Sequence, residues 1–123
     1  MIVGIDHLQI SIPAGRVEEA LAFYVGILGF TRVPKPAEMS PTGAWLVSSK
    51  NQAGVNLHLG EIEKFTTDGN AHPALLVTDL SPLLLQLEAA HFRVRRESTP
   101  HGFSRASTWD PFGNRIEFMQ PMT

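Results

Sequence analysis

The sequence predicts an α+β fold built from two tandem units, each containing one strand, one helix and three further strands. Two observations support this prediction. The same order of strand-like and helix-like segments occurs twice along the chain. Side chains that can bind a metal also recur at matching places, because His72 follows His7 by 65 residues and Glu117 follows His58 by 59. A duplicated unit whose loops differ in length would bring these four residues to equivalent positions.

The first unit is expected to span about residues 1–60. Its predicted elements are a strand at 5–12, a helix at 17–28 and strands at 30–33, 44–48 and 55–59. The helix is expected to bury Val17, Leu21, Tyr24 and Leu28, which recur at helical spacing, and to stop at Gly29. The segment 34–43 is rich in proline and glycine, which predicts a loop and a candidate lid. The turn-rich segment 49–54 predicts a hairpin.

A polar linker is expected at about 61–70, and the second unit at about 71–123. Its predicted elements are a strand at 71–77, a helix from about 80 to 90 and strands at 93–97, 105–109 and 115–119, with a break at 100–102. The helix is expected to be capped by Asp79 or Ser81 and to bury Leu80, Leu84 and Leu87. The segment 110–114 (DPFGN) predicts the turn of the last hairpin.

Length and composition favour one globular domain covering residues 1–123, because 43% of the 123 residues are hydrophobic. Ten Lys and Arg against twelve Asp and Glu give a net charge of −2 without charged blocks, so we expect no nucleic-acid partner. No apolar stretch is long enough to cross a bilayer, and we expect no membrane partner. The absence of cysteine fits a cytoplasmic protein and requires that any metal be held by nitrogen and oxygen.

Strand alternation predicts which way the four candidate ligands point. In the first strand Leu8, Ile10 and Ile12 share the face expected to pack under the helix, while His7, Gln9 and Ser11 share the other face. The same argument places Leu57 and Leu59 in the core opposite His58, and Ile116 and Phe118 in the core opposite Arg115, Glu117 and Met119. His72 is placed less clearly, because its neighbour Pro73 favours a strand start or an edge.

Imidazoles and a carboxylate on one sheet face suit Zn, Ni, Fe(II), Mn or Co. His7, His72 and Glu117 would form a set of two histidines and one carboxylate with open positions for a substrate or oxygen. His58 is then a fourth ligand or a nearby base, so His58 and Glu117 are also the candidate catalytic residues. The alternative is that each histidine is structural, which is common for a single histidine on a strand.

Several segments together resemble one known family. They are the Asp6-His7 start, residues 22–24 (AFY) and 28–30 (LGF), Ala71-His72, and the closing 110–117 (DPFGNRIE). The chain is similar over nearly its whole length to the vicinal oxygen chelate superfamily, which includes glyoxalase I, extradiol dioxygenases, fosfomycin-resistance transferases and bleomycin-resistance proteins. The most specific part is the closing segment combined with the two histidines.

The resemblance implies two βαβββ modules whose mostly antiparallel sheets curl around a metal, with His7, His72 and Glu117 at the usual ligand positions. His58 departs from glyoxalase I, which commonly has a carboxylate or amide there. A neutral imidazole can still act as a base near pH 7. By analogy, the substrate is expected to chelate the metal through adjacent oxygens, so that the metal stabilises an enediolate or another oxyanion.

Three functions therefore stay open: a glyoxalase-like lyase or isomerase, which we favour, an Fe(II) extradiol-type dioxygenase, and a small-molecule or antibiotic-binding protein without catalysis. Candidate substrate contacts are Gln9, Arg105, Ser107 and Trp109, with Arg105 placed to bind an anionic group. The site is expected to form within one chain or across a homodimer. The dimer is favoured, because small members of this superfamily usually pair and half-open sheets leave their edges exposed.

Overall fold

The structure is a computed structural model that describes residues 1–49, 54–98 and 102–122. The predicted turn at 49–54 and the predicted break at 100–102 lie mostly outside these residues. The chain divides into two compact units, unit 1 (Met1–Thr66) and unit 2 (Thr67–Thr123). Among the described residues, no helix is long and apolar enough to cross a membrane.

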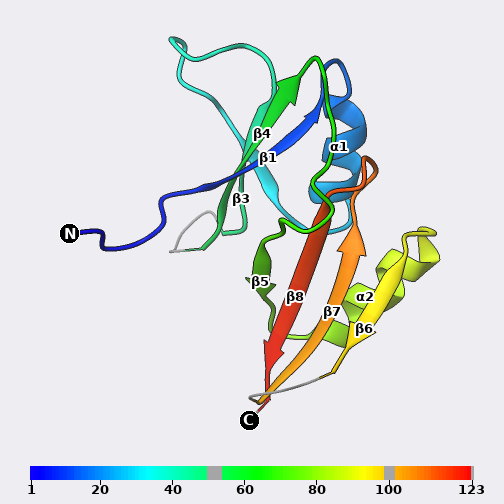
Figure 1. The fold of residues 1–123 in the computed structure, drawn as a ribbon. Helices are drawn as coiled ribbons and strands as arrows, with labels where there is room; N and C mark the ends of the chain where they lie inside the picture. The colour runs from blue at the N-terminus through cyan, green and yellow to red at the C-terminus, as the bar shows by residue number, and fades with distance from the viewer. Residues whose placement is uncertain (50–53, 99–101, 123) are drawn as a thin grey trace. The chain divides into compact units, whose positions relative to one another are not determined.

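Each unit contains one helix and a four-stranded sheet. Figure 1 shows these elements as a ribbon. Unit 1 comprises β1 (Leu8–Pro13), α1 (Val17–Tyr24), β2 (Thr31–Val33), β3 (Ala44–Val47) and β4 (Asn56–Ile62). Unit 2 comprises β5 (Ala74–Leu76), α2 (Leu80–Ala89), β6 (Val94–Glu97), β7 (Phe103–Trp109) and β8 (Arg115–Pro121). The predicted α+β class and the repeated strand, helix and three-strand order are confirmed.

The two sheets have equivalent strand orders, β1-β4-β3-β2 in unit 1 and β5-β8-β7-β6 in unit 2. The first strand of each sheet pairs in parallel with the fourth, and the other neighbours pair antiparallel. A parallel pair needs a crossover, and in each unit the helix lies within that connection. Both sheets are therefore mixed but mostly antiparallel, as expected.

Most of the predicted core is buried. Unit 1 buries Ile10, Ile12, Leu57 and Leu59, and unit 2 buries Leu80, Leu84, Leu87, Ile116 and Phe118. The prediction for the first helix was wrong in part, because α1 ends at Tyr24 and buries Ala20, Phe23 and Tyr24, while Val17 and Leu21 stay partly exposed. A helix of eight residues has too few turns for its spacing alone to define the buried side.

The turn before β8 is held by one buried carboxylate. Asp110 Oδ1 accepts hydrogen bonds from the backbone N–H groups of Phe112 (2.9 Å) and Asn114 (2.8 Å), and Oδ2 accepts one from Asn114 Nδ2 (2.8 Å). Gly113 follows with a φ of 92°, which side chains other than glycine rarely adopt. This turn sets the register of β7 and β8 and so places Ser107 opposite Glu117.

The N-terminus of α2 is not capped as expected, and its C-terminus is followed by a left-handed residue. Asp79 occupies the N-cap position but makes no side-chain cap bond, and the N–H of Leu80 instead donates to Gln120 Oε1 at 2.7 Å. After the helix, His91 has a φ of 66°, the conformation that Gly29 adopts (φ 83°) after α1. His91 thus takes a left-handed position that the repeat fills with glycine in unit 1.

A carboxylate on β4 connects two loops of unit 1. Glu61 Oε1 accepts the backbone N–H of Gly15, and Oε2 accepts that of Gly43, both at 2.6 Å. These two backbone hydrogen bonds, assisted by the charge of Lys35, hold the pKa of Glu61 below its usual value although burial opposes them. β4 also continues past the predicted linker start at residue 61, because Glu61 and Ile62 pair with the end of β1.

Replacing His91 by glycine should stabilise the protein. A non-glycine residue in the left-handed region costs roughly 1–2 kcal/mol, and glycine adds unfolded-state entropy of about 0.5–1 kcal/mol. We expect His91→Gly to raise the free energy of unfolding by about 0.5–1 kcal/mol, measured by urea denaturation. Gly29→Ala should act in the opposite direction. A loss of stability in His91→Gly would contradict this account of the helix end.

Glu61→Gln should destabilise the protein by about 1–2 kcal/mol at pH 7, because a charged acceptor of two backbone N–H groups is lost. The folded pKa lies below the usual 4.5, so this stabilisation is complete above 4.5 and disappears as the pH falls through the folded value. The deficit should therefore shrink in strongly acidic solution. Urea unfolding at pH 7 and in strongly acidic solution measures this deficit, with exposed Glu63→Gln as the control. An equal deficit in stability under the two pH conditions would refute the argument that the charge of Glu61 stabilises the fold.

Candidate functional site

The strand registers place the four candidate ligands at equivalent positions of the two units. Gln9 pairs with His58 in unit 1, and Ala74 pairs with Glu117 in unit 2. His7 lies two residues before Gln9, and His72 lies two residues before Ala74. The duplicated arrangement that the sequence spacing predicted is therefore present in the backbone pairing. Each unit carries one histidine before its first strand and one candidate ligand on its fourth strand.

In unit 1 the candidate residues form a column of three stacked rings. Trp45 stacks on His58 with ring centroids 4.2 Å apart and planes 4° apart, and His58 stacks on His7 at 4.0 Å and 18°. The antiparallel pairing of Trp45 with His58 explains the first contact. The Nδ1–H of His7 donates to Asp6 Oδ2 at 2.9 Å, which leaves its Nε2 free to bind another group.

A cavity of about 590 Å³ lies beside this ring column, within unit 1. Its volume lies in the range of small-molecule sites, about 300–1,000 Å³. The column contributes His7, Trp45 and His58 to the lining, and the predicted lid loop contributes Lys35, Met39, Ser40 and Thr42. Gln9 also lines the cavity and extends over Gly60, where an added Cβ would lie 2.6 Å from Gln9 Nε2. Unit 1 thus offers a small-molecule pocket with an aromatic wall.

His58 is held in its neutral form by its surroundings. Burial lowers its pKa first, and the charges of His7 and Lys35 lower it further against the opposing effect of Asp6. Among the described residues, His58 has no hydrogen-bonding partner for its ring nitrogens. The side chain is therefore a neutral imidazole at pH 7 with a lone pair for a metal or a proton.

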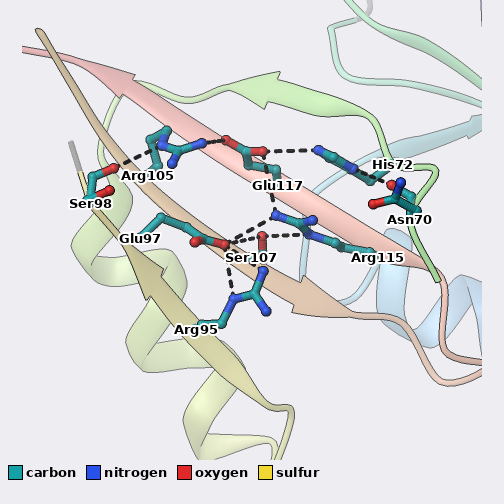
Figure 2. A network of polar contacts seen from close by, with 9 residues as sticks. All are labelled: Asn70, His72, Arg95, Glu97, Ser98, Arg105, Ser107, Arg115 and Glu117. Atoms are coloured by element: carbon teal, nitrogen blue, oxygen red, sulfur yellow. Dashed lines mark hydrogen bonds and ion pairs between the residues drawn. The ribbon is translucent and has the colours of Figure 1, made fainter. Parts of the chain in front are cut away.

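In unit 2, His72 and Glu117 face each other, as Figure 2 shows. The Nδ1 of His72 lies 2.8 Å from the backbone oxygen of Asn70, and its Nε2 lies 3.2 Å from Glu117 Oε1. Both ring nitrogens thus face oxygen acceptors, although a neutral imidazole has only one N–H. With Nδ1–H donated to Asn70, the Nε2 lone pair of His72 faces Glu117 Oε1, and a metal ion between the two atoms would be bound by both.

The His72–Glu117 distance fits a shared metal as well as a shared proton. Ligands about 2.1 Å from a metal with tetrahedral or octahedral angles lie about 3.0–3.4 Å apart. The observed 3.2 Å falls in this range. The Asn70 carbonyl orients the ring in the manner typical of metal-binding histidines, whose second nitrogen donates to an oxygen.

Glu117 has further partners on the same sheet face. Its residue is only 4% exposed, and Arg105 Nη1 donates to its Oε2 at 2.9 Å. Arg105 also donates through Nε to the backbone oxygen of Ser98 at 3.0 Å. Arg115 Nη2 lies 3.9 Å from Glu117 Oε1. The carboxylate therefore has one oxygen held by Arg105 and the other directed to His72.

The predicted substrate contacts of unit 2 all have partners within the unit. Arg105 binds Glu117, and buried Ser107 donates to Glu97 Oε1 at 3.1 Å. Trp109 lies under the guanidinium of Arg93, 4.0 Å from the ring centroid. Contact of these three residues with a substrate stays a prediction.

Sequence reasoning placed Arg115 on the face of Glu117 without giving it a role, and it missed Glu97. Arg115 is visible from alternation, since it lies two residues before Glu117 on the same face of β8. Glu97 becomes visible only from the pairing of β6 with β7, which places it opposite Arg105. Within residues 1–49, 54–98 and 102–122, no three His, Asp or Glu side chains gather into one metal-binding group. Each unit by itself supplies two candidate ligands.

Comparison with known proteins gives a consistent result. The family model of the Glyoxalase/Bleomycin resistance protein/Dioxygenase superfamily matches residues 4–118. A putative glyoxalase family protein from Bacillus anthracis is 34% identical, with a TM-score of 0.87 and coverage of 98% of this chain and 97% of that one. No curated protein matches the chain.

Two further solved structures are informative. The antibiotic-binding protein TnmS3 from Streptomyces sp. CB03234 is 27% identical, with a TM-score of 0.69 and coverage of 98% of this chain and 99% of that one. A fosfomycin resistance protein from Listeria monocytogenes has a TM-score of 0.77 at 13% identity, over 99% of this chain and 96% of that one. The second likeness concerns the fold alone.

Trp45→Ala should raise the pKa of His58 toward its usual 6.5, because removing the stacked ring exposes the imidazole to water. In the native protein the lowered pKa keeps His58 neutral until the pH falls below 6.5, and the variant should protonate at higher pH. NMR titration of the metal-free protein measures the midpoint. Trp109→Ala, in the other unit, is the matched control. An unchanged His58 midpoint in Trp45→Ala would rule out stacking as the source of the shift.

Proposed function

Because the chain belongs to the glyoxalase/bleomycin resistance protein/dioxygenase superfamily, we propose that it is a metal-dependent enzyme of glyoxalase type. The proposed reaction is a lyase or isomerase step on a small substrate that chelates the metal through adjacent oxygens. The observation that supports it most strongly is the His72–Glu117 pair. The two side chains face each other with an N···O distance of 3.2 Å, a separation that suits two ligands of one metal ion.

The proposed ligands are His7, His72 and Glu117, with His58 as a fourth ligand or as the base. The donor chemistry of each unit fits a divalent ion such as Zn, Ni, Fe, Mn or Co. In both units the histidine before the first strand donates its Nδ1–H to an oxygen, from Asp6 or from Asn70, and presents its Nε2. This orientation by an outer oxygen is what metal-binding histidines require.

The chain's own residues supply binding and proton transfer in this proposal. The bound metal would act as a Lewis acid that stabilises an oxyanion on the substrate. His58, kept neutral by burial and by the charges of His7 and Lys35, can accept a proton at pH 7. The pocket of unit 1 can shelter a small substrate against the ring column, with the lid loop contributing polar groups.

A second candidate function is binding of a small molecule without catalysis. The pocket with its aromatic wall is suited to hold a flat organic molecule whether or not a reaction follows. The likeness to an antibiotic-binding protein at 27% identity supports this alternative. Turnover separates the two functions, since a binding protein returns its ligand unchanged.

A homodimer is part of the proposal. Each sheet has two edge strands, β1 and β2 in unit 1 and β5 and β6 in unit 2, and proteins commonly cover such edges by association. Light scattering on the purified protein tests the dimer. A monomer at all concentrations would remove this part of the proposal without affecting the metal ligands.

Replacing a proposed ligand should remove the metal. We expect His7→Ala, His72→Ala and Glu117→Ala each to lower divalent-metal affinity by at least about tenfold, because each deletes one donor. Mass spectrometry of protein purified without chelator gives the metal content, and titration gives the affinity. His91→Asn is the matched control, since it changes a histidine at a helix end. If all three alanine variants keep the native metal content, the protein is not a metalloenzyme of this kind.

The identity of the metal and its reaction then separate the enzyme classes. Zinc or nickel with turnover of a thiol adduct of a ketoaldehyde would support the lyase. Iron with oxygen uptake on catechols would instead support the dioxygenase. Tight binding of an aromatic ligand by metal-free protein, with no turnover in either assay, would support the binding protein.

A further inference from the structure

Glu97 is the centre of an ion-pair network that no proposed step uses (Figure 2). Its Oε1 accepts hydrogen bonds from Arg95 Nη2 at 3.0 Å, Ser107 Oγ at 3.1 Å and Arg115 Nη2 at 3.2 Å. Its side chain is 17% exposed. Burial alone would raise the pKa of Glu97, but hydrogen bonds from Arg95 and Ser107 and the charges of Arg95 and Arg115 together lower it. Glu97 is therefore an anchored negative charge.

Arg115 lies between two carboxylates and is held by one of them. Its Nη2 is 3.2 Å from Glu97 Oε1 and 3.9 Å from Glu117 Oε1. Its Nε donates to Ser107 Oγ at 3.0 Å, which keeps the guanidinium over β7. The hydroxyl of Ser107 in turn donates to Glu97. Two of the guanidinium nitrogens are thus committed to the Glu97 side of the network.

The Glu117 oxygen that Arg115 approaches is also the one that faces His72. Glu117 Oε2 already accepts from Arg105, and Glu117 Oε1 faces both His72 Nε2 and Arg115. A guanidinium that closed onto Oε1 would form a charge-assisted hydrogen bond there. It would then occupy a lone pair of the oxygen and place a positive charge beside any metal ion.

We propose that Glu97 is a positioning residue that holds Arg115 away from Glu117, so that Glu117 Oε1 stays available to a metal beside His72. This inference rests on the proposed metal-binding function. Arg115 is the internal competitor of the metal, and Glu97 with Ser107 restrains it. Outer residues of this kind commonly change metal affinity by about 10–100-fold when they are replaced.

The test is a double-variant cycle measured as Zn²⁺ affinity, by competition with a chromophoric chelator at pH 7. Glu97→Gln keeps the shape and removes the charge, so it should weaken Zn²⁺ binding about tenfold or more as Arg115 closes onto Glu117. Arg115→Gln should bind Zn²⁺ as tightly as the native protein or more tightly. The double variant should return to the affinity of Arg115→Gln, because no competitor remains to be restrained.

Glu88→Gln is the matched control. Glu88 also pairs with an arginine, Arg96, at 3.3 Å, but the pair is exposed and belongs to none of the Glu117 contacts. It should leave Zn²⁺ affinity unchanged. Circular dichroism of every variant reports folding, and Arg115→Gln tests the competition by itself if Glu97→Gln does not fold.

The outcomes separate this inference from the proposed function. If the native protein binds Zn²⁺ and Glu97→Gln binds it equally well, Glu97 has no positioning role and the metal site still stands. If the double variant stays as weak as Glu97→Gln, Glu97 acts as a structural support and the competition is refuted. A large loss of Zn²⁺ affinity in Arg115→Gln would also refute the proposed competition between Arg115 and the metal. If the native protein binds no divalent metal, the proposed function fails first.

Discussion

The buried carboxylate of Glu117 is the constraint on which the polar face of unit 2 depends. An ionised carboxylate that leaves water costs several kcal/mol unless cationic and hydrogen-bonding groups replace the solvent. The register of β7 and β8 supplies Arg105 for one oxygen, and the chain before β5 supplies His72 for the other. His72 precedes β5 and Arg105 lies on β7, so the contacts of Glu117 link β8 to the segments on both sides of it.

The same backbone positions carry different chemistry in unit 1. His58 replaces Glu117, and Trp45, which pairs with His58, replaces Ser107. A neutral imidazole needs no counter-charge, so aromatic rings can pack against it where unit 2 requires guanidinium groups. Burial lowers the pKa of His58, and the charge of His7 lowers it further. The fourth strand of unit 1 thus carries a neutral imidazole, His58. The fourth strand of unit 2 carries a carboxylate, Glu117, that is paired with arginine.

Local patterns in the sequence were sufficient for much of this arrangement. Alternation along single strands predicted that His58 and Glu117 face away from the core, and the similar spacing of the two pairs predicted that the units match. The stacking of Trp45 and the hub at Glu97 required knowledge of strand pairing, which depends on turns and on contacts distant in sequence. The buried face of α1 was mispredicted in part. Helical spacing alone did not show that Ala20 and Phe23 would be buried, because the position of the sheet also decides this.

The charge balance of unit 2 bears on the ligand of either candidate function. Among the described residues of this network, Arg95, Arg105 and Arg115 face two carboxylates, Glu97 and Glu117, so the arginines exceed the carboxylates by one. A metal ion bound beside His72 would increase that excess. A ligand that is anionic, or that develops an oxyanion, reduces it. This charge balance therefore favours an anionic ligand for either candidate function, with or without a metal.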